Sequence, residues 1–263
     1  MTFIWGSTFS VTKFAVGDIP PLLLQGMRFA LAAAVVGIYT RRDIRATTRS
    51  SVRAGIVLGF LLGGGFALQT VGIAYTTASN AGFLTGTLVV FTPLLQTIIE
   101  RKAPGWANLA GVALVAAGLA VFTSPSGAAF GVGDLLVLAC AVLFALHVVY
   151  LDVFTKERFD REIVFYQFLV TSLLGFLLFP FIPSSPPAWT LSALVAVVYL
   201  ALFASAFALF ILSKCQRETT PTRAALIYTM EPVIAAVIAS LALGERMSGT
   251  AVAGAALMTA GLM

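Results

Sequence analysis

The chain has 263 residues, of which 59% are hydrophobic and 10% are charged. A soluble domain carries about a quarter charged residues, which cover its water-facing surface. The composition, with a mean hydropathy of +0.99, therefore excludes a water-soluble enzyme and predicts an integral membrane protein. The net charge of +5 does not indicate a nucleic-acid partner, because the basic residues lie in short runs between long apolar stretches.

Apolar stretches follow one another along the whole chain. A helix that spans a bilayer needs roughly 20 mostly apolar residues, and clusters of Gly, Pro, Ser and Asn separate the stretches. We predict an all-α bundle of ten transmembrane helices with no soluble domain, in which the first span stays as an anchor because no basic leader precedes it. The predicted spans are 2–17, 20–40, 54–75, 80–99, 105–123, 132–151, 162–182, 189–212, 222–242 and 248–263.

Lysine and arginine residues are concentrated in alternate connections, and connections of this kind face the cytoplasm. The opposite connections contribute only Arg246, with Lys13 near the outer end of the first span. The bias predicts a bacterial inner-membrane protein with both termini in the cytoplasm. The thirteen residues of the predicted cytoplasmic set are Arg41, Arg42, Arg45, Arg49, Arg53, Arg101, Lys102, Lys156, Arg158, Arg161, Lys214, Arg217 and Arg223.

The second half of the chain repeats features of the first after a shift of 143 residues. With five spans in each half, the halves enter the membrane in opposite directions, as in many secondary transporters. We therefore predict two inverted five-helix repeats, residues 1–123 and 132–263. Pro93 and Pro232 do not coincide under this shift, because they are displaced by four residues. The matches are Phe60 with Phe203, Ser79-Asn80-Ala81 with Thr222-Arg223-Ala224, and Gly111, Leu114 and Gly118 with Gly254, Leu257 and Gly261.

A series of short motifs extends over the whole chain. They are Trp5-Gly6-Ser7-Thr8-Phe9, Pro21 with Arg28-Phe29, Thr76-Thr77-Ala78-Ser79-Asn80-Ala81-Gly82-Phe83-Leu84-Thr85-Gly86, and Glu231-Pro232 with Gly244-Glu245-Arg246 before Gly254. Their order resembles the EamA-type members of the drug/metabolite transporter superfamily. The resemblance implies a ten-helix inverted repeat that exports amino acids, related metabolites or toxic compounds through a central cavity by alternating access.

The sequence lacks the motifs of an intramembrane enzyme. It contains no His-Glu-x-x-His helix, no Gly-x-Ser-x-Gly elbow and no cluster of carboxylates, and His147 is its only histidine. Cys140 and Cys215 are isolated, so they have neither metal-site nor disulfide spacing. We predict no catalysis, no metal and no cofactor.

Three ionisable residues fall inside predicted spans, where a charge is costly and usually faces a cavity or a partner. Glu231 lies near the midplane and is a candidate for proton coupling or for a substrate amine; its alternative role is to bond a carbonyl freed by Pro232. Arg28 is favoured as a helix-fixing residue, with a substrate carboxylate as the alternative. His147, expected four residues from the cytoplasmic end of its span, suits a proton relay or a carbonyl contact.

Polar and aromatic side chains at helical spacing predict a mildly polar, aromatic-lined chamber between the halves. We expect spans one, three, four, six, eight and nine to form it, and spans five and ten to lie outside. Pro93 and Pro232 are candidate hinges or static kinks, and a single Ser or Thr can instead bond within its helix. The predicted lining residues are Trp5, Ser7, Thr8, Gln69, Thr85, Thr92, Gln96, His147, Tyr150, Ser205, Tyr228 and Glu231.

These features favour a secondary active transporter that exports small zwitterionic or amphipathic metabolites, with amino acids, aromatic ones included, as the expected substrates. The partners are then a small molecule and the lipid bilayer; a monomer fits, and the oligomeric state stays open. A sugar-phosphate or nucleotide-sugar exchanger is the first alternative, but it needs clustered cations at the midplane, where only Arg28 lies. A membrane protein without transport is the second, and it gives no reason for an inverted repeat.

Overall fold

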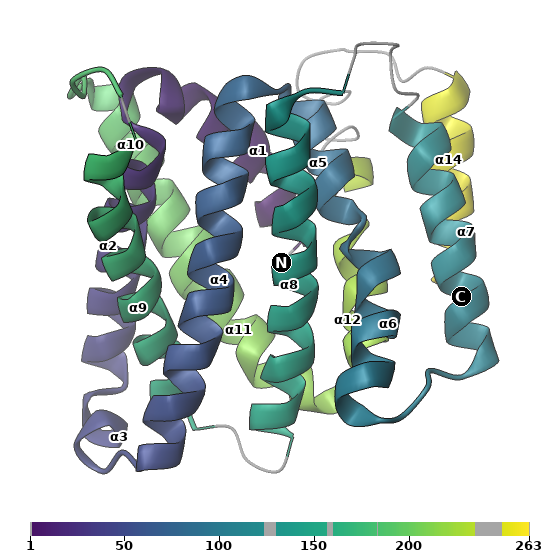
Figure 1. The fold of residues 1–263 in the computed structure, drawn as a ribbon, viewed down its shortest axis with the longest axis horizontal. Coiled ribbons are helices and arrows are strands. Elements are labelled where there is room, and N and C mark those ends of the chain that lie inside the picture. Colours follow the sequence, from purple (N-terminus) through teal and green to yellow (C-terminus); the bar gives the residue numbers. More distant parts are fainter. Residues whose placement is uncertain (1, 124–129, 157–159, 183, 235–248, 263) are drawn as a thin grey trace.

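The structure, a computed structural model, describes residues 2–123, 130–156, 160–182, 184–234 and 249–262. Within these ranges the chain is helical and contains no β-strand. The helices lie side by side in one bundle, with their connections at its two ends (Figure 1). Predicted spans or parts of spans that fall in 235–248 lie outside the described residues.

The first half of the chain is a series of helices joined by short breaks. Breaks at Thr40, Ala46–Thr48, Thr76–Thr77 and Thr87 separate the elements after α2, and threonine side chains at 48 and 77 cap α4 and α5 by accepting bonds from Ser51 N and Asn80 N. The elements are α1 (Thr2–Asp18), α2 (Pro21–Tyr39), α3 (Arg41–Arg45), α4 (Arg49–Tyr75), α5 (Ala78–Gly86), α6 (Leu88–Glu100) and α7 (Trp106–Thr123).

The second half contains a span that is not a regular α-helix. A π-helical segment, Leu200–Phe207, joins α10 to α11 without a turn, and Thr190 caps α10. The elements are α8 (Val132–Thr155), α9 (Glu162–Leu178), α10 (Leu191–Tyr199), α11 (Ala208–Cys215), α12 (Pro221–Tyr228) and α14 (Gly249–Ala260), with short 3₁₀ turns at Phe179–Phe181 and Gln216–Glu218.

In the described part of the chain, six helical stretches are long and apolar enough to cross a membrane. They support the prediction of an integral membrane protein at the level of composition and length. They are Pro21–Tyr39, Arg49–Tyr75, Asn80–Glu100, Val132–Thr155, Glu162–Phe181 and Leu191–Glu218, and shorter apolar helices cover Trp106–Val121 and Gly249–Ala260.

The described residues of the predicted cytoplasmic set gather at one end of the bundle, the lower end in Figure 1. We call it the basic end; Arg158 lies outside the described residues. Lys13 belongs to the opposite end, where its Nζ donates to the carbonyl oxygens of Ile73 at 2.6 Å and Thr76 at 2.7 Å. Because the last carbonyls of a helix lack intrahelical partners, Lys13 caps the end of α4.

Glycines allow the closest helix contacts. The α7 and α14 helices pack against each other at one edge of the bundle (Figure 1). A Cβ on Gly118 would lie 2.8 Å from the carbonyl oxygen of Gly254, and one on Gly261 would lie 2.7 Å from that of Gly111. Only glycine permits this approach of two backbones, so these four residues form the α7–α14 seam.

Several predicted boundaries differ from the helix ends in the structure. The third span begins at Arg49 rather than 54, and two further differences affect predicted site residues. The sixth span continues to Thr155 rather than 151, so His147 lies eight residues inside its end instead of four. The extension is stabilised by the ion pair of Asp152 with Lys156 and by the Thr155 hydroxyl, which donates to the Leu151 carbonyl. The fourth span is divided at Thr87, six residues before Pro93, so the break is not at the predicted hinge.

Candidate functional site

A cavity lies between the two halves of the chain and encloses about 600 Å³ of atom-free space, part of it open to the outside. We call it the central cavity. It is lined by Trp5, Thr8, Phe9, Arg28, Leu62, Phe66, Gln69, Thr85, Leu88, Phe144, His147, Val148, Leu209, Leu212, Tyr228 and Glu231.

The lining comes from α1, α2, α4, α5, α6, α8, α11, α12 and the residues after α12. Each of the six predicted spans contributes, and α2 adds Arg28. The described residues of α7 and α14 contribute none. Seven predicted lining residues border the cavity: Trp5, Thr8, Gln69, Thr85, His147, Tyr228 and Glu231.

Five predicted lining residues do not border the cavity, because each is engaged elsewhere. The Ser7 hydroxyl bonds the Tyr199 hydroxyl at 2.7 Å, and the Thr92 hydroxyl donates to the Leu88 carbonyl of its own helix. Ser205 accepts a bond from a buried arginine. Tyr150 stacks on Phe154 with ring centroids 5.9 Å apart, and Gln96 belongs to a separate network.

Arg28 is 5% exposed and projects from α2 into the cavity wall. Its Nε donates to Ser205 Oγ at 2.6 Å, which links α2 to the π-helical segment. The guanidinium carbon lies 4.6 Å from the ring centroid of Phe66 and 5.1 Å from that of Phe29. These ring faces attract the cation, and among the described residues Arg28 forms no ion pair.

His147 faces the cavity from α8 and is 3% exposed. Its Nε2 lies 3.0 Å from Gln167 Oε1 on α9. Since an amide oxygen only accepts hydrogen bonds, His147 donates from Nε2. Gln167 Nε2 in turn contacts Ser213 Oγ at 3.4 Å, so His147 is oriented by a chain of neutral groups.

Glu231 and Tyr228 border the cavity at the end of α12. Tyr228 meets Trp5 edge to face, with ring centroids 5.5 Å apart. The Trp5 indole donates to the Ala204 carbonyl at 2.9 Å, so α1 is fixed to the π-helical segment. On the opposite wall Gln69 Nε2 donates to Thr85 Oγ1 at 3.1 Å and joins α4 to α5.

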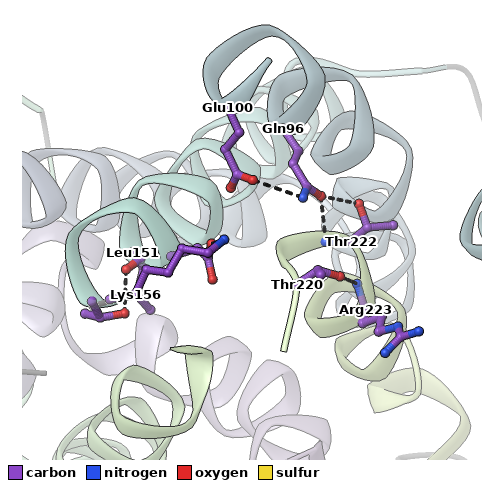
Figure 2. Close-up of polar contacts among 9 residues, drawn as sticks. Gln96, Glu100, Leu151, Lys156, Thr220, Thr222 and Arg223 are labelled. Atoms are coloured by element: carbon purple, nitrogen blue, oxygen red, sulfur yellow. Dashed lines mark hydrogen bonds and ion pairs between the residues drawn. The ribbon is translucent and has the colours of Figure 1, made fainter. Parts of the chain in front are cut away.

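A polar network lies between the central cavity and the basic end (Figure 2). Gln96 Oε1 accepts bonds from the Thr222 hydroxyl at 2.6 Å and the Thr222 N–H at 3.3 Å, and its Nε2 donates to Glu100 Oε2 at 3.2 Å. Gln96 is eight residues beyond the lining residue Leu88, or about 12 Å along the helix. The network therefore joins α6 to α12 below the cavity.

The phenylalanine and aliphatic residues of the lining are not among the predicted ones. Phe66, Phe144, Leu62 and Leu209 border the cavity, but they sit in spans that are apolar on every face, so no sequence periodicity separates them from lipid-facing neighbours. The π-helical segment was missed for a related reason, since it differs from an α-helix only in hydrogen-bond register.

Comparison with known proteins gives the site its context. The EamA-like transporter family matches residues 1–124 and 131–263. An uncharacterized transporter of Archaeoglobus fulgidus is 27% identical over 98% of this chain and 80% of its own length. A probable amino-acid metabolite efflux pump of Salmonella typhimurium is 26% identical over 98% of this chain and 90% of its own.

A solved crystal structure agrees with the fold. It superimposes with a TM-score of 0.79 at 20% sequence identity and covers 99% of this chain and 93% of that one. The family match spans nearly the whole chain, in agreement with the resemblance carried by the sequence motifs. The protein therefore belongs to the EamA-like transporter family.

Proposed function

We propose that the chain is a secondary active transporter that exports small zwitterionic or amphipathic metabolites, with amino acids, aromatic ones included, as substrates. The observation that carries this proposal is the central cavity, which combines an aromatic and aliphatic wall with a few convergent polar groups. Arg28 and Glu231 supply a cationic and an acidic side chain in that wall. The name of the Salmonella relative, an amino-acid metabolite efflux pump, supports the same substrate class.

Two inverted five-helix repeats, 1–123 and 132–263, are the architecture we assign to this transporter. Five pairs of cavity-lining residues are related by the shift of 143 residues found in the sequence, which supports the assignment. A shared origin predicts such pairs because equivalent helices then present equivalent positions to the midplane. The pairs are Trp5 with Val148, Phe66 with Leu209, Gln69 with Leu212, Thr85 with Tyr228, and Leu88 with Glu231.

The α7–α14 seam and the helix breaks support the same assignment. Gly111 contacts Gly261 while Gly118 contacts Gly254, which is the crossed pairing expected of two equivalent helices related by a two-fold axis. The turn at Thr87 and the turn at Thr229–Met230 also agree under the shift. At each turn a threonine hydroxyl donates to the carbonyl three residues earlier.

In this mechanism the cavity opens alternately to the two sides of the membrane, and the basic end faces the cytoplasm. The Gln96–Thr222 contact closes the basic end, so its loss accompanies opening there. Glu231 carries the coupling proton, because it is the one carboxyl group in the described lining of the cavity and its surroundings alternate as the cavity opens to either side. Both termini then lie on the cytoplasmic side of a bacterial inner membrane.

Counterflow in liposomes tests the function. Purified protein is reconstituted with unlabelled amino acids, sugar phosphates or lipophilic cations on the inside, and uptake of a labelled compound of the same class is followed for each. We expect exchange with bulky amino acids and weaker competition by small charged ones. Exchange with sugar phosphates alone would instead establish the alternative exchanger, and absence of exchange with the whole panel would refute the transport proposal.

Single-cysteine labelling tests the orientation. Cysteines that replace Arg45 and Arg161 at the basic end should react with an impermeant reagent only from the cytoplasm, and one that replaces Ser185 only from outside. Cys140 and Cys215 are replaced first, since Cys215 is exposed. Reaction of Arg45→Cys from outside would reverse the proposed orientation.

A further inference from the structure

The terminal nitrogens of Arg28 are the feature of the central cavity that the fold leaves unexplained. The side chain is 95% buried, yet within the described part of the chain only Nε makes a hydrogen bond, to Ser205. A guanidinium has five N–H donors, so four remain on the two terminal nitrogens. Phe29 and Phe66 present ring faces to the cation but no oxygen that accepts a bond from these donors.

A helix-fixing role accounts for only part of this arrangement. The Nε bond to Ser205 is sufficient to tie α2 to the π-helical segment. Glu231 borders the same cavity but does not form an ion pair with Arg28. A buried charge without a counter-ion is strongly destabilising. Arg28 is therefore a buried cation at the cavity wall, and no described residue accepts a hydrogen bond from its two terminal nitrogens.

We propose that the Arg28 guanidinium is the subsite for the carboxylate of the substrate, an inference that rests on the transport function proposed above. A planar guanidinium fork matches a carboxylate with two parallel N–H···O bonds. The bond from Nε to Ser205 fixes the orientation of the fork, so Ser205 is a positioning residue. Phe66, Phe144 and Leu62 line the same cavity and receive the apolar body of the substrate.

The number of cationic side chains in the described lining favours a carboxylate ligand over a phosphate. A phosphate group carries a larger charge and is held in proteins by clusters of donors. Arg28 is the only arginine or lysine in the described lining of the cavity. The site therefore takes one carboxylate attached to an apolar or aromatic body.

Calorimetric binding to purified full-length protein in nanodiscs tests the subsite without requiring transport. The probes are phenylalanine, 3-phenylpropionate, phenylalaninamide and phenethylamine, which share a ring and differ in the carboxylate. We expect the two carboxylates to bind at least about tenfold more tightly than the amide and the amine, as for a charge-assisted pair. Because this comparison varies only the ligand, it stands even if an Arg28 variant does not fold.

Variants then test whether Arg28 is the source of the preference for carboxylates. Arg28→Gln should abolish the preference for carboxylates, Arg28→Lys should retain part of it, and Ser205→Ala should reduce it without removing it. Arg49→Gln, at the basic end, is the matched control and should bind like the wild type. Thermal unfolding of each variant verifies that it is folded.

The outcomes separate the subsite from the transport proposal. Equal binding of phenylalanine and phenylalaninamide would overturn the carboxylate subsite and leave amino-acid transport standing. Binding of 3-phenylpropionate that depends on Arg28, without binding of phenylalanine, would support the subsite and refute amino acids as substrates. Failure of all four probes to bind would refute both.

Discussion

Under the proposed repeat, the two halves of the cavity wall have equivalent positions that carry different chemistry. Gln69 and Thr85 of the first half bond each other, while their counterparts Leu212 and Tyr228 present a methyl-rich and an aromatic surface. Leu88 of the first half corresponds to Glu231 of the second. In the proposed transporter the repeated frame supplies two routes of opening, whereas the unlike side chains of the two halves supply a single substrate site.

Substitutions in the α7–α14 seam should have the largest effect, which is on the stability of the fold. Gly118→Leu and its counterpart Gly261→Leu each drive a side chain into the facing backbone, and overpacking of this kind costs about 1–3 kcal/mol or more. We expect both variants to lose most of their folded yield, measured by size-exclusion chromatography and thermal unfolding in detergent. Gly105→Leu is the matched control, because a Cβ there has no neighbour within 4 Å.

Equal stability of Gly118→Leu and Gly105→Leu would show that the close contact of α7 with α14 does not require glycine. A large difference between Gly118→Leu and Gly261→Leu would contradict the two-fold relation of the halves, since crossed contacts make the two substitutions alike.

Substitution of Glu231, compared with substitution of its counterpart Leu88, should give the next largest effect, which is on the pH dependence of transport. Glu231→Gln keeps the size and shape of the side chain but cannot release a proton. We expect it to retain exchange of substrate between the two sides and to lose the dependence of net transport on a pH gradient, both measured in liposomes. Leu88→Gln, at the equivalent position, should keep its pH response.

Glu231 is a structural residue instead if folded Glu231→Gln responds to pH as the wild type does. In that case the variant should show lower thermal stability and expression, since a bond within the bundle is lost. The comparison with Leu88→Gln distinguishes a specific effect of the carboxyl from a general effect of altering the wall.

Gln96 tests how the halves are held together at the basic end. Gln96→Leu leaves the Thr222 hydroxyl and N–H without their acceptor, at a cost of about 1–3 kcal/mol. We expect a lower melting temperature and faster labelling of Thr85→Cys from the cytoplasmic side, in a chain without its native cysteines. Thr97→Val, whose hydroxyl bonds only Pro93 of its own helix, is the control and should label slowly.

The Lys156–Asp152 pair gives the smallest effect. A hydrogen bond from Lys156 to Asp152 raises the pKa of the Lys156 ammonium. Its stabilising contribution is therefore complete below the pKa of an unfolded lysine and decreases as the pH rises through the folded value. Because Lys156 is 57% exposed, we expect less than about 1 kcal/mol.

Thermal unfolding between pH 8 and pH 11 checks this sign. The difference between the wild type and Lys156→Met should shrink toward the alkaline end. A difference that grows with pH would mean that the ammonium is not what Asp152 stabilises.

The sequence predicts the helical membrane fold and the common end of the basic residues well, because both depend on local composition. It predicts seven lining residues that are polar or aromatic, since such side chains stand out in an apolar span. It fails where the determinant is a distant partner: Arg28 meets Ser205 across 177 positions of the chain. It also fails at Phe66 and Phe144, which differ from lipid-facing phenylalanines only in tertiary position.

The π-helical segment has a consequence for changes in chain length. A π turn holds one residue more than an α turn, so deletion of one residue within Leu200–Phe207 allows the α-helical pattern to resume with α10 and α11 in their present phase. The same deletion inside α4 would rotate everything beyond it by about 100°. The π-helical segment, which also contacts Trp5 and Arg28, therefore holds one residue that can be deleted while α10 and α11 keep their phase.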